Sequence, residues 1–243
     1  MNPEDQIILI DKPAGISSFG VVAKVRSYLK QIYGRKIKVG HTGTLDPFAT
    51  GLLIILTGKM TKKSGEFLKQ NKIYEATLKL GYTSSTGDPE GEITEYATRA
   101  GGGAWGTPTE LADVGENATT GPTREKVEAI LQSFIGEIEQ KVPAFSAVKI
   151  NGERAYKLAR KGIDFEPPTR TVTTYSIDIV SYHYPELKIR THVSSGTYIR
   201  TLAEDIGKAL GTGAYLTSLR RTQIANYSVK NARPLTDYEE APL

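Results

Sequence analysis

Residues 40–51, GHTGTLDPFATG, are the segment that most constrains how this chain can fold. Three glycines and Pro47 surround a single acid, Asp46, and the segment runs directly into the apolar residues 52–56, LLIIL. Glycine permits backbone angles that other residues avoid and proline fixes φ, so this composition predicts a tight loop before a buried strand. Such a loop can hold a carboxylate in one orientation. A turn in which Asp46 only accepts backbone N–H bonds fits the pattern equally well.

Apolar periodicity predicts further strands and helices along the chain. Strands are predicted over residues 7–10, 52–56, 72–82, 138–150, 169–182 and 187–194. Helices are predicted to begin at Ser17 or Ser18 and at Thr123, and to cover 153–161 and 197–210. Because these elements do not alternate as a strict βαβ repeat, we expect an α+β fold with a mixed, largely antiparallel central sheet flanked by helices.

The chain shows no internal repeat and no interior linker, so one domain over residues 1–232 is the simplest division. Residues 99–122 are rich in Gly, Thr and Ala, and we expect them to form a long surface insertion of that domain. Residues 233–243 are expected to be a short C-terminal tail, too short for an independent domain.

Composition excludes several kinds of site. Cysteine is absent and the three histidines form no HExxH pattern, so we expect no metal site. The N-terminus lacks a basic segment before its short apolar run, and no stretch approaches the roughly 18 apolar residues of a membrane span. We therefore expect a cytoplasmic protein that does not enter a membrane.

Charge is distributed unevenly along the chain. The net charge is only +4, but residues 12–45 hold seven basic residues and no acidic one, whereas residues 88–116 hold seven acids and one base. A positive face of this kind is suited to a polyanion such as RNA. Charge runs that merely solvate exposed faces explain the same distribution equally well.

Nucleotide-binding and hydrolase motifs are incomplete. Residues 57–59, TGK, resemble the end of a phosphate-binding loop, but Leu53 replaces its first glycine and Met60 its Ser/Thr. The run GGG at 101–103 lacks the strand and helix of a dinucleotide site, and no GxSxG elbow surrounds the serines near His192.

Arg200 lies in the segment 195–203, SGTYIRTLA, where we predict the first turn of a helix capped by Ser195 or Thr197. A positive charge at this end opposes the helix dipole, so a carboxylate partner such as Asp46 would relieve the conflict. An exposed, solvated arginine is the commoner arrangement.

Several short motifs follow one another in a specific order. They are DKP with Gly15 and Ser17-Ser18 (from residue 11), GHTGTLDPFATGLL (40–53), Lys72-x-Tyr74, PAFSAVK with Gly152, Ala155-Tyr156 and Ala159-Arg160 (143–160), SSGTYIRTLAEDIG (194–207) and LRRT (219–222). Together they closely resemble the TruB family of tRNA pseudouridine synthases, over most of the chain outside residues 99–122 and the C-terminal tail.

The resemblance implies a pseudouridine synthase fold and a set of site residues. Asp46 resembles the aspartate that attacks the target nucleotide, Arg200 the arginine that pairs with it, and Tyr74 the tyrosine that stacks on the base. A packing role in the core is the alternative for Tyr74, because tyrosine is common on half-buried strands.

The resemblance also implies residues that bind the substrate. Tyr198 and Leu219 resemble residues that line the uracil pocket, and His41 resembles a residue near the flipped nucleotide. For Leu219 a plain core role is equally plausible. Lys12, and the basic residues from Lys149 to Arg170, are expected to contact RNA phosphates.

The activity implied is conversion of uridine to pseudouridine at position 55 in the T loop of tRNA, with the base flipped out of its stack. The reaction needs no cofactor, and we expect no obligatory protein partner. The carboxylate could attack the sugar, attack the base, or act in an elimination through a glycal.

Many relatives continue into a C-terminal RNA-binding domain, often of PUA type, and we expect none here and hence weaker tRNA binding. A guide-RNA-dependent subunit and a tRNA-folding chaperone are the alternatives.

Overall fold

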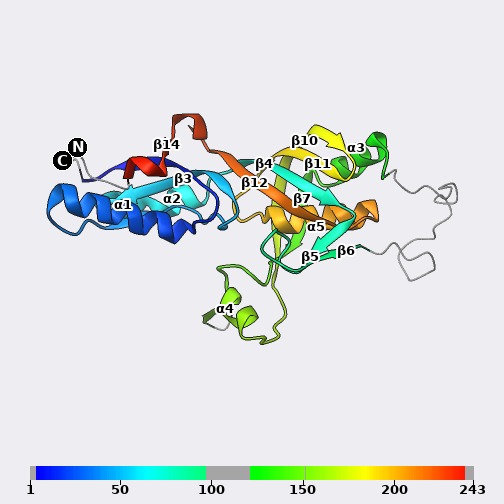
Figure 1. Ribbon diagram of the computed structural model, residues 1–243, viewed down its shortest axis with the longest axis horizontal. Coiled ribbons are helices and arrows are strands. Elements are labelled where there is room, and N and C mark those ends of the chain that lie inside the picture. The colour runs from blue at the N-terminus through cyan, green and yellow to red at the C-terminus, as the bar shows by residue number, and fades with distance from the viewer. Residues whose placement is uncertain (1–3, 97–120, 151, 239–243) are drawn as a thin grey trace.

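The computed structural model describes residues 4–96, 121–150 and 152–238. The predicted insertion at 99–122 lies outside these ranges except for residues 121 and 122. Figure 1 shows an elongated molecule with α1 (Ser18–Tyr33) at one end and α3 (Arg124–Ser133) at the other. None of the helices within the described ranges is long and apolar enough to cross a membrane.

A ten-stranded sheet runs through the molecule in the order β14-β1-β3-β12-β4-β11-β10-β7, with β13 beside β12 and β2 beside β3. Its strands are β1 (Ile7–Lys12), β2 (Val39–His41), β3 (Thr50–Thr57), β4 (Lys72–Leu80), β7 (Gly136–Lys141), β10 (Thr169–His183), β11 (Glu186–Val193), β12 (Ala214–Ile224), β13 (Tyr227–Ser228) and β14 (Arg233–Pro234). Only the β1–β14 and β3–β12 pairs are parallel. The predicted α+β fold with a mixed, largely antiparallel sheet is confirmed.

The remaining elements lie around this sheet. The other helices are α2 (Ser64–Leu68), α4 (Ala155–Arg160), α5 (Ile199–Leu210) and the 3-10 turns η1 (Gly58–Lys63), η2 (Val229–Asn231) and η3 (Leu235–Tyr238). Two small hairpins pair β5 (Tyr82–Ser84) with β6 (Ile93–Glu95) and β8 (Lys149–Ile150) with β9 (Glu153–Arg154). Beyond the predicted domain boundary, β14 pairs with β1, and Leu235 and Tyr238 of η3 pack against α1.

Helix starts follow the predicted caps in two of three cases. Ser17 accepts the N–H of Gly20 at 3.0 Å before α1, and Thr123 accepts the N–H of Lys126 at 3.3 Å before α3. The predicted cap of α5 by Ser195 or Thr197 is wrong. The N-cap position is Tyr198, and no side chain caps the first turn; the N–H of Tyr198 itself donates to the side chain of Gln140 in β7 at 3.0 Å.

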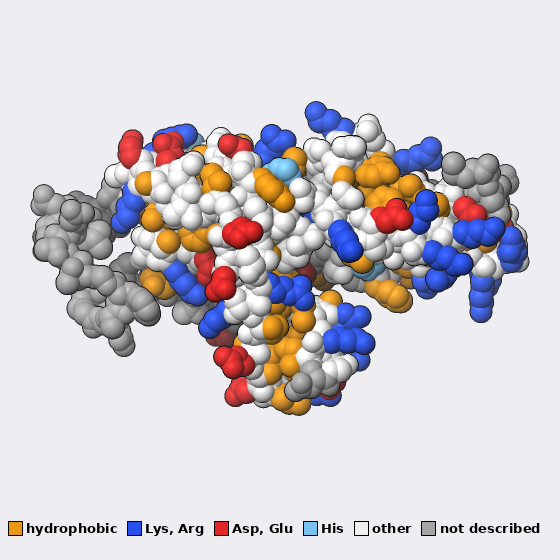
Figure 2. All heavy atoms as spheres, turned by 180° about the vertical axis from the view of Figure 1, so that it is seen from behind, with side chains coloured by type: hydrophobic (Ala, Val, Ile, Leu, Met, Phe, Trp, Pro, Cys, Tyr) orange, Lys and Arg blue, Asp and Glu red, His pale blue; other side chains and the backbone are white. Residues whose placement is uncertain are grey.

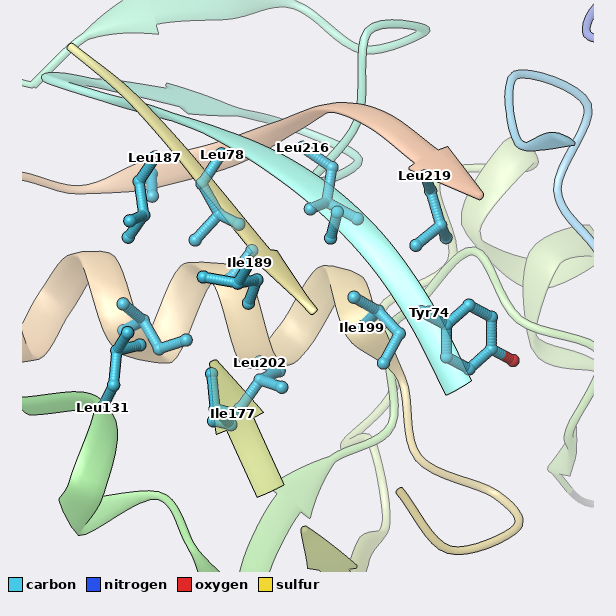
Figure 3. Packing of buried hydrophobic residues seen from close by; sticks show 14 of the residues in the cluster. Tyr74, Leu78, Leu131, Ile177, Leu187, Ile189, Ile199, Leu202, Leu216 and Leu219 are labelled. Atoms are coloured by element: carbon cyan, nitrogen blue, oxygen red, sulfur yellow. The ribbon is translucent and has the colours of Figure 1, made fainter. Parts of the chain in front are cut away.

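Two large hydrophobic cores lie at the two ends of the sheet. One joins β1, β3 and α1, and the other packs β4, β11 and β12 against α5 and α3, as Figure 3 shows. Strand β3 is buried on both faces, since Leu53 and Ile55 point into the α1 core while Leu52 and Ile54 join a third cluster with Phe67. This burial explains its continuous apolar run.

Two strand predictions need correction. The strand predicted over 138–150 ends at Lys141, and the chain then leaves the sheet. Strand β12 was not predicted, although it joins the two halves of the sheet by pairing with both β3 and β4. Its polar residues at 217–218 and 220–223 interrupt the apolar pattern, because this strand carries site and surface residues rather than a simple core face.

Candidate active site

A pocket of about 460 Å³ lies where β4, β12, the start of α5 and the loop before β3 meet. It is also lined by Phe145, Ser146, Ala147 and Tyr156 from residues 143–150 and 152–168, here called the arm. The arm carries β8, β9 and α4 and stands away from the sheet in Figure 1. Among the predicted site residues, those that line the pocket are Asp46, Tyr74, Tyr198, Arg200 and Leu219.

Arg200 joins two carboxylates at the wall of the pocket. Its Nε lies 3.1 Å from Asp46 Oδ2, and its Nη1 lies 3.3 Å from Asp88 Oδ2. The side chains of Arg200 and Asp88 are 5% and 3% exposed, whereas that of Asp46 is 33% exposed. The pairing of Asp46 with Arg200 is therefore present, and Asp46 is the carboxylate of the group that lines the pocket.

Backbone carbonyls complete the surroundings of Arg200. Nη1 donates to the carbonyl of Thr86 and Nη2 to that of Phe145, both at 2.9 Å. Asp88 is held in turn, because its Oδ1 accepts the hydroxyl of Thr86 at 2.6 Å and the N–H of Glu90 at 3.0 Å. The guanidinium therefore has hydrogen-bond or ion-pair partners around it. Arg200 is the second residue of α5, where the helix dipole disfavours a positive charge, and its two carboxylate partners offset that effect.

Opposing effects act on the ionisation of Asp46. Burial raises its pKa above the ordinary value of 3.8, the Arg200 guanidinium lowers it, and the Asp88 carboxylate raises it again. More distant Lys12 and Arg221 lower it. The pKa of Asp46 remains raised, so this carboxylate accepts a proton more readily than an exposed aspartate.

Buried donors hold the loop that carries Asp46, residues 43–50. The hydroxyl of Ser18 accepts the N–H of Leu45 at 2.8 Å and donates to its carbonyl at 2.9 Å. The N–H of Gly15 donates to the carbonyl of Pro47 at 2.9 Å. The Gly/Pro loop predicted from the sequence is present, but contacts from α1 and the DKP segment fix its shape as much as its own residues do.

Lys12 has no exposed surface. Its Nζ donates to the carbonyls of Pro13 and Ile16 at 2.8 Å and of Pro47 at 3.2 Å. Burial is the main cause that lowers its pKa to about 8. The predicted phosphate contact by Lys12 does not fit this geometry, because the ammonium is enclosed and bonded to carbonyls; its place is beneath the Asp46 loop.

Tyr74 and Leu219 contribute apolar surface to both the core and the pocket. They are 7% and 6% exposed, and Figure 3 shows them at the end of the α5 core nearest Ile199, with the Tyr74 hydroxyl pointing away from the labelled leucines. A place in the core therefore does not prevent either side chain from facing the pocket, and the binding roles expected of both stay predictions. Tyr198 lines the pocket, with its backbone N–H and carbonyl both bound by the side chain of Gln140.

His41 and Lys149 are not among the residues that line the pocket. His41 ends β2, and its Nδ1 accepts the N–H of Gly43 at 3.3 Å at the start of the Asp46 loop. Burial, followed by the charge of Arg221, lowers its pKa below 6.5, which favours the neutral imidazole. Lys149 is exposed in β8 on the arm. The roles expected of both residues stay predictions.

Sequence reasoning missed four residues of the site. Asp88 sits in a segment that reads only as an acidic run, and Lys72, Ser146 and Arg221 were noted only as parts of motifs. Ser146 Oγ is buried without a hydrogen-bond partner, and Lys72 is 6% exposed with a pKa lowered by burial to about 8. A signal in the sequence was available for Arg221. Neighbouring residues on a strand point to opposite faces, so one arginine of the pair Arg220-Arg221 had to point inward if the segment was a strand with one buried face.

No group of three or more His, Asp or Glu side chains in the described part of the chain is arranged to hold a metal ion. The charged groups that line the pocket are one carboxylate and three cations, those of Lys72, Arg200 and Arg221; hydroxyl, aromatic and aliphatic groups form the rest of its walls. That combination suits a planar polar molecule and acid–base or nucleophilic chemistry by Asp46.

Comparisons with known proteins identify the family. Residues 30–101 and 103–199 match the model of the TruB family pseudouridylate synthase N-terminal domain, and residues 200–242 match that of the tRNA pseudouridylate synthase B C-terminal domain. The chain is 45% identical to the tRNA pseudouridine synthase B of Phocaeicola vulgatus, covering 98% of this chain and 93% of the relative. It is 44% identical to that of Nitrosospira multiformis, covering 97% and 69%.

A solved structure titled as a Cbf5-Nop10-Gar1 complex contains a chain with the same fold. Its TM-score is 0.65 at 28% identity, and the match covers 96% of this chain but 53% of that one. The present chain therefore spans about half the length of that solved relative. With a family model that matches more than half of the sequence, the chain belongs to the TruB family of pseudouridylate synthases.

Proposed function

We propose that this protein converts uridine to pseudouridine in tRNA, at position 55 of the T loop, with Asp46 as the catalytic carboxylate. The observation that carries the proposal is Asp46 itself: a partly exposed acid at the pocket wall, paired at 3.1 Å with a buried arginine that a second carboxylate holds in place. The names of the relatives in Phocaeicola and Nitrosospira support tRNA as the substrate.

The reaction is an isomerisation. The bond between N1 of uracil and C1′ of ribose breaks, the base turns over, and a bond forms between C5 and C1′. The proton lost from C5 is balanced by the one gained at N1, so the reaction needs neither redox chemistry nor water. Asp46 can act by attack on C1′, by attack on C6, or by removal of a sugar proton in a route through a glycal. Each route requires an ionised carboxylate aimed at the nucleotide, which the Arg200 pair favours.

A base in a stacked RNA loop cannot reach this pocket, so the target nucleotide must be flipped out. The ring of Tyr74 supplies an aromatic surface for stacking on the uracil, and Leu219 an aliphatic one. Both are held by the α5 core, so the surfaces are formed before the substrate binds. The polar edge of the base would then meet the groups at the opposite wall.

Two groups of exposed basic residues are placed to bind the RNA backbone. One lies around the C-terminal end of α1 and η1, and the other is on the arm; Figure 2 shows Lys and Arg side chains gathered in both regions. Their members are Lys30, Lys36, Lys38, Lys59, Lys62 and Lys63 in the first group, and Lys149, Arg154, Lys157 and Arg160 in the second. Contacts of this kind position an RNA stem without reading its sequence.

A guide-RNA-dependent subunit is the main alternative, since the Cbf5 complex shares the fold. The identity to that chain is 28%, against 45% to a relative named as a tRNA pseudouridine synthase that is spanned almost completely. These values support an enzyme that modifies tRNA without a guide. Activity of the purified chain on bare tRNA would decide between the two functions.

The test is to incubate the purified protein with an unmodified tRNA transcript and to locate pseudouridine by carbodiimide-based mapping. We expect modification at position 55 with wild type. Asp46→Asn should slow the single-turnover rate by at least about 10³-fold, as expected when a catalytic group is removed. Asp178→Asn, an exposed aspartate on β10, is the matched control and should react like wild type.

The outcomes separate the parts of the proposal. Absence of pseudouridine with wild type would refute the tRNA-modifying function. Modification at another position would refute only the assignment of the T loop. Full activity of Asp46→Asn would refute only the role given to Asp46.

A further inference from the structure

Strand β12 carries two adjacent arginines in contrasting environments. Arg220 is 37% exposed and forms two hydrogen bonds with Asp11, at 3.0 and 2.7 Å. Arg221 is 1% exposed and lines the pocket from the other face of the strand. It is among the largest fully buried side chains of the described chain. Within the described residues, no carboxylate lies within the 4.0 Å limit of an ion pair with it.

The guanidinium of Arg221 bonds to backbone carbonyls at both ends of the Asp46 loop. Nε donates to the carbonyl of Leu52 at 2.8 Å, just after the loop. Nη2 donates to Gly43 at 3.1 Å, and Nη1 lies 3.5 Å from the carbonyl of Thr44, just before Asp46. One rigid, planar group thus bridges the two stems of the loop.

The backbone forces Arg221 into this position. Gly51 and Arg221 are partners in the parallel pairing of β3 and β12, and Gly51 has a φ of +100°. A Cβ on Gly51 would lie 2.3 Å from the carbonyl oxygen of Arg221. The two strands are therefore in backbone contact at the point where the Asp46 loop enters β3, and the arginine side chain begins directly beside that loop.

Burial of a guanidinium without an anionic partner opposes folding, which makes a purely structural role a poor explanation. The charge does act on the site. Arg221 lowers the pKa of Asp46, and of Lys12, Lys72 and His41 as well. The groups that influence Asp46 are Arg200 from α5, Asp88 from the segment after β5, Lys12 from β1 and Arg221 from β12.

We propose that Arg221 is a positioning residue for the isomerisation: it clamps the stems of the Asp46 loop and so aims the carboxylate into the pocket. This inference rests on the catalytic role proposed for Asp46. Reactive groups need supporting residues that hold them to within a fraction of an ångström, and an error of about 1 Å can reduce the rate about 100-fold.

The experiment compares Arg221→Gln and Arg221→Lys with Arg220→Gln. The last variant is a close control, because it removes the same charge from the next position of the same strand. It breaks the ion pair with Asp11 and a 3.4 Å bond to the hydroxyl of Thr50 at the end of the loop, but it leaves the bonds of Arg221 to Leu52, Gly43 and Thr44 intact. For each protein we would measure the single-turnover rate on the tRNA transcript at saturating enzyme, the Kd for tRNA, the melting temperature, and amide hydrogen exchange in residues 41–50.

We expect Arg221→Gln to lower the single-turnover rate about 100-fold, with the Kd for tRNA changed little, because misaiming affects the chemical step. Arg221→Lys should recover part of the rate, since it keeps the charge but not the planar fork. Exchange should rise at the amides of Leu45 and Ala49, which are bonded within the loop and its anchor. The pH at which the rate falls on acidification should be higher in Arg221→Gln than in wild type, because loss of a cation that lowers the pKa of Asp46 raises that pKa. Arg220→Gln should change none of these.

The proposal fails if Arg221→Gln and Arg220→Gln have similar rates and similar exchange in the loop. It also fails if both Arg221 variants do not fold, because Arg221 would then serve the stability of the sheet. Hydrogen exchange does not depend on activity, so it tests the clamp separately. A wild-type protein that does not modify tRNA would refute the proposed function, and a fully active Asp46→Asn variant would refute the role of Asp46. In both cases hydrogen exchange would still show whether Arg221 clamps the loop.

Discussion

The Asp46 loop and the arm line the same pocket but are held in opposite ways. The loop is bonded from beneath by Ser18, Lys12 and Arg221, three side chains that are at most 1% exposed and that come from separate elements. The arm is held mostly by its own bonds, such as those from Ala155 to Val148 and from Tyr156 to Ser146. A notable link from the arm to the site is the bond between Arg200 and the carbonyl of Phe145.

This difference suits a reaction on a flipped nucleotide. A carboxylate that performs chemistry must have one orientation, and the loop fixed by the core would give Asp46 that orientation in its proposed role. A part that meets RNA outside the core needs exposed charge and can shift with little loss of buried surface. The comparison predicts that changes beneath the loop affect the chemical step, whereas changes on the arm affect binding.

The largest effect is expected from Arg200→Gln. It removes a buried charge between Asp46 and Asp88 and leaves the fully buried Asp88 without its cation. Breaking a buried pair in this way costs roughly 3–5 kcal/mol of unfolding free energy. Urea denaturation would measure the loss, and single-turnover assays the accompanying fall in rate.

Arg124→Gln is the matched control for that variant. This variant breaks the ion pair between Arg124 and Glu128, whose side chains are 56% and 50% exposed, respectively. The expected loss of unfolding free energy is therefore below about 1 kcal/mol. Equal losses in the two variants would contradict the distinction between the buried site and the exposed surface.

A smaller effect is expected in the dependence of the rate on pH. Asp46 must be ionised to act, and burial raises its pKa, so the rate should fall on acidification with a midpoint above 3.8. Asp88→Asn removes an anion that raises the pKa of Asp46, so the midpoint should move to lower pH even if the rate itself is reduced. Single-turnover rates across the acid range would measure it. A midpoint that rises in this variant would show that Asp88 acts mainly by holding Arg200.

The smallest effect is expected on the arm, from Lys149→Gln. If the exposed ammonium contacts one phosphate, tRNA affinity should fall several-fold, and the slope of log Kd against log salt should decrease by about 0.7–0.9. The rate at saturating enzyme should not change. Filter binding at several salt concentrations would measure the affinity, with Lys188→Gln as the control, since Lys188 pairs with Glu75 on the face of β4 opposite Tyr74. A loss confined to the saturated rate would contradict the division between loop and arm.

Much of the site could be predicted because it is encoded in short segments. The Gly/Pro loop around Asp46, the Ser17 and Thr123 caps and the buried run of β3 all follow from neighbouring residues. The motifs also predicted the family, which the comparisons confirm. The position of Arg200 at a predicted helix N-terminus indicated a carboxylate partner such as Asp46, with an exposed arginine as the alternative. The catalytic and binding roles stay predictions.

The remaining features depend on pairings between distant parts of the chain. Arg200 binds the carbonyl of Thr86 across 114 positions of sequence, and Arg221 binds Gly43 across 178. Neither contact leaves a local pattern, because each joins segments that are far apart in the sequence; the contact of Arg221 depends on the pairing of β12 with β3. The enclosed position of Lys12 has the same origin, since only the folded Asp46 loop covers it.

The position of Asp46 in a constrained loop before a buried strand follows from neighbouring residues, because glycine, proline and apolar residues restrict the local backbone wherever they occur. The groups that surround the Asp46 carboxylate come from distant segments and depend on how those segments pack. The reason is that register, burial and charge are set by segments that meet across the sheet. Arg221 thus lies beside the Asp46 loop through strand pairing, and Asp88 is linked to Asp46 through Arg200 of α5.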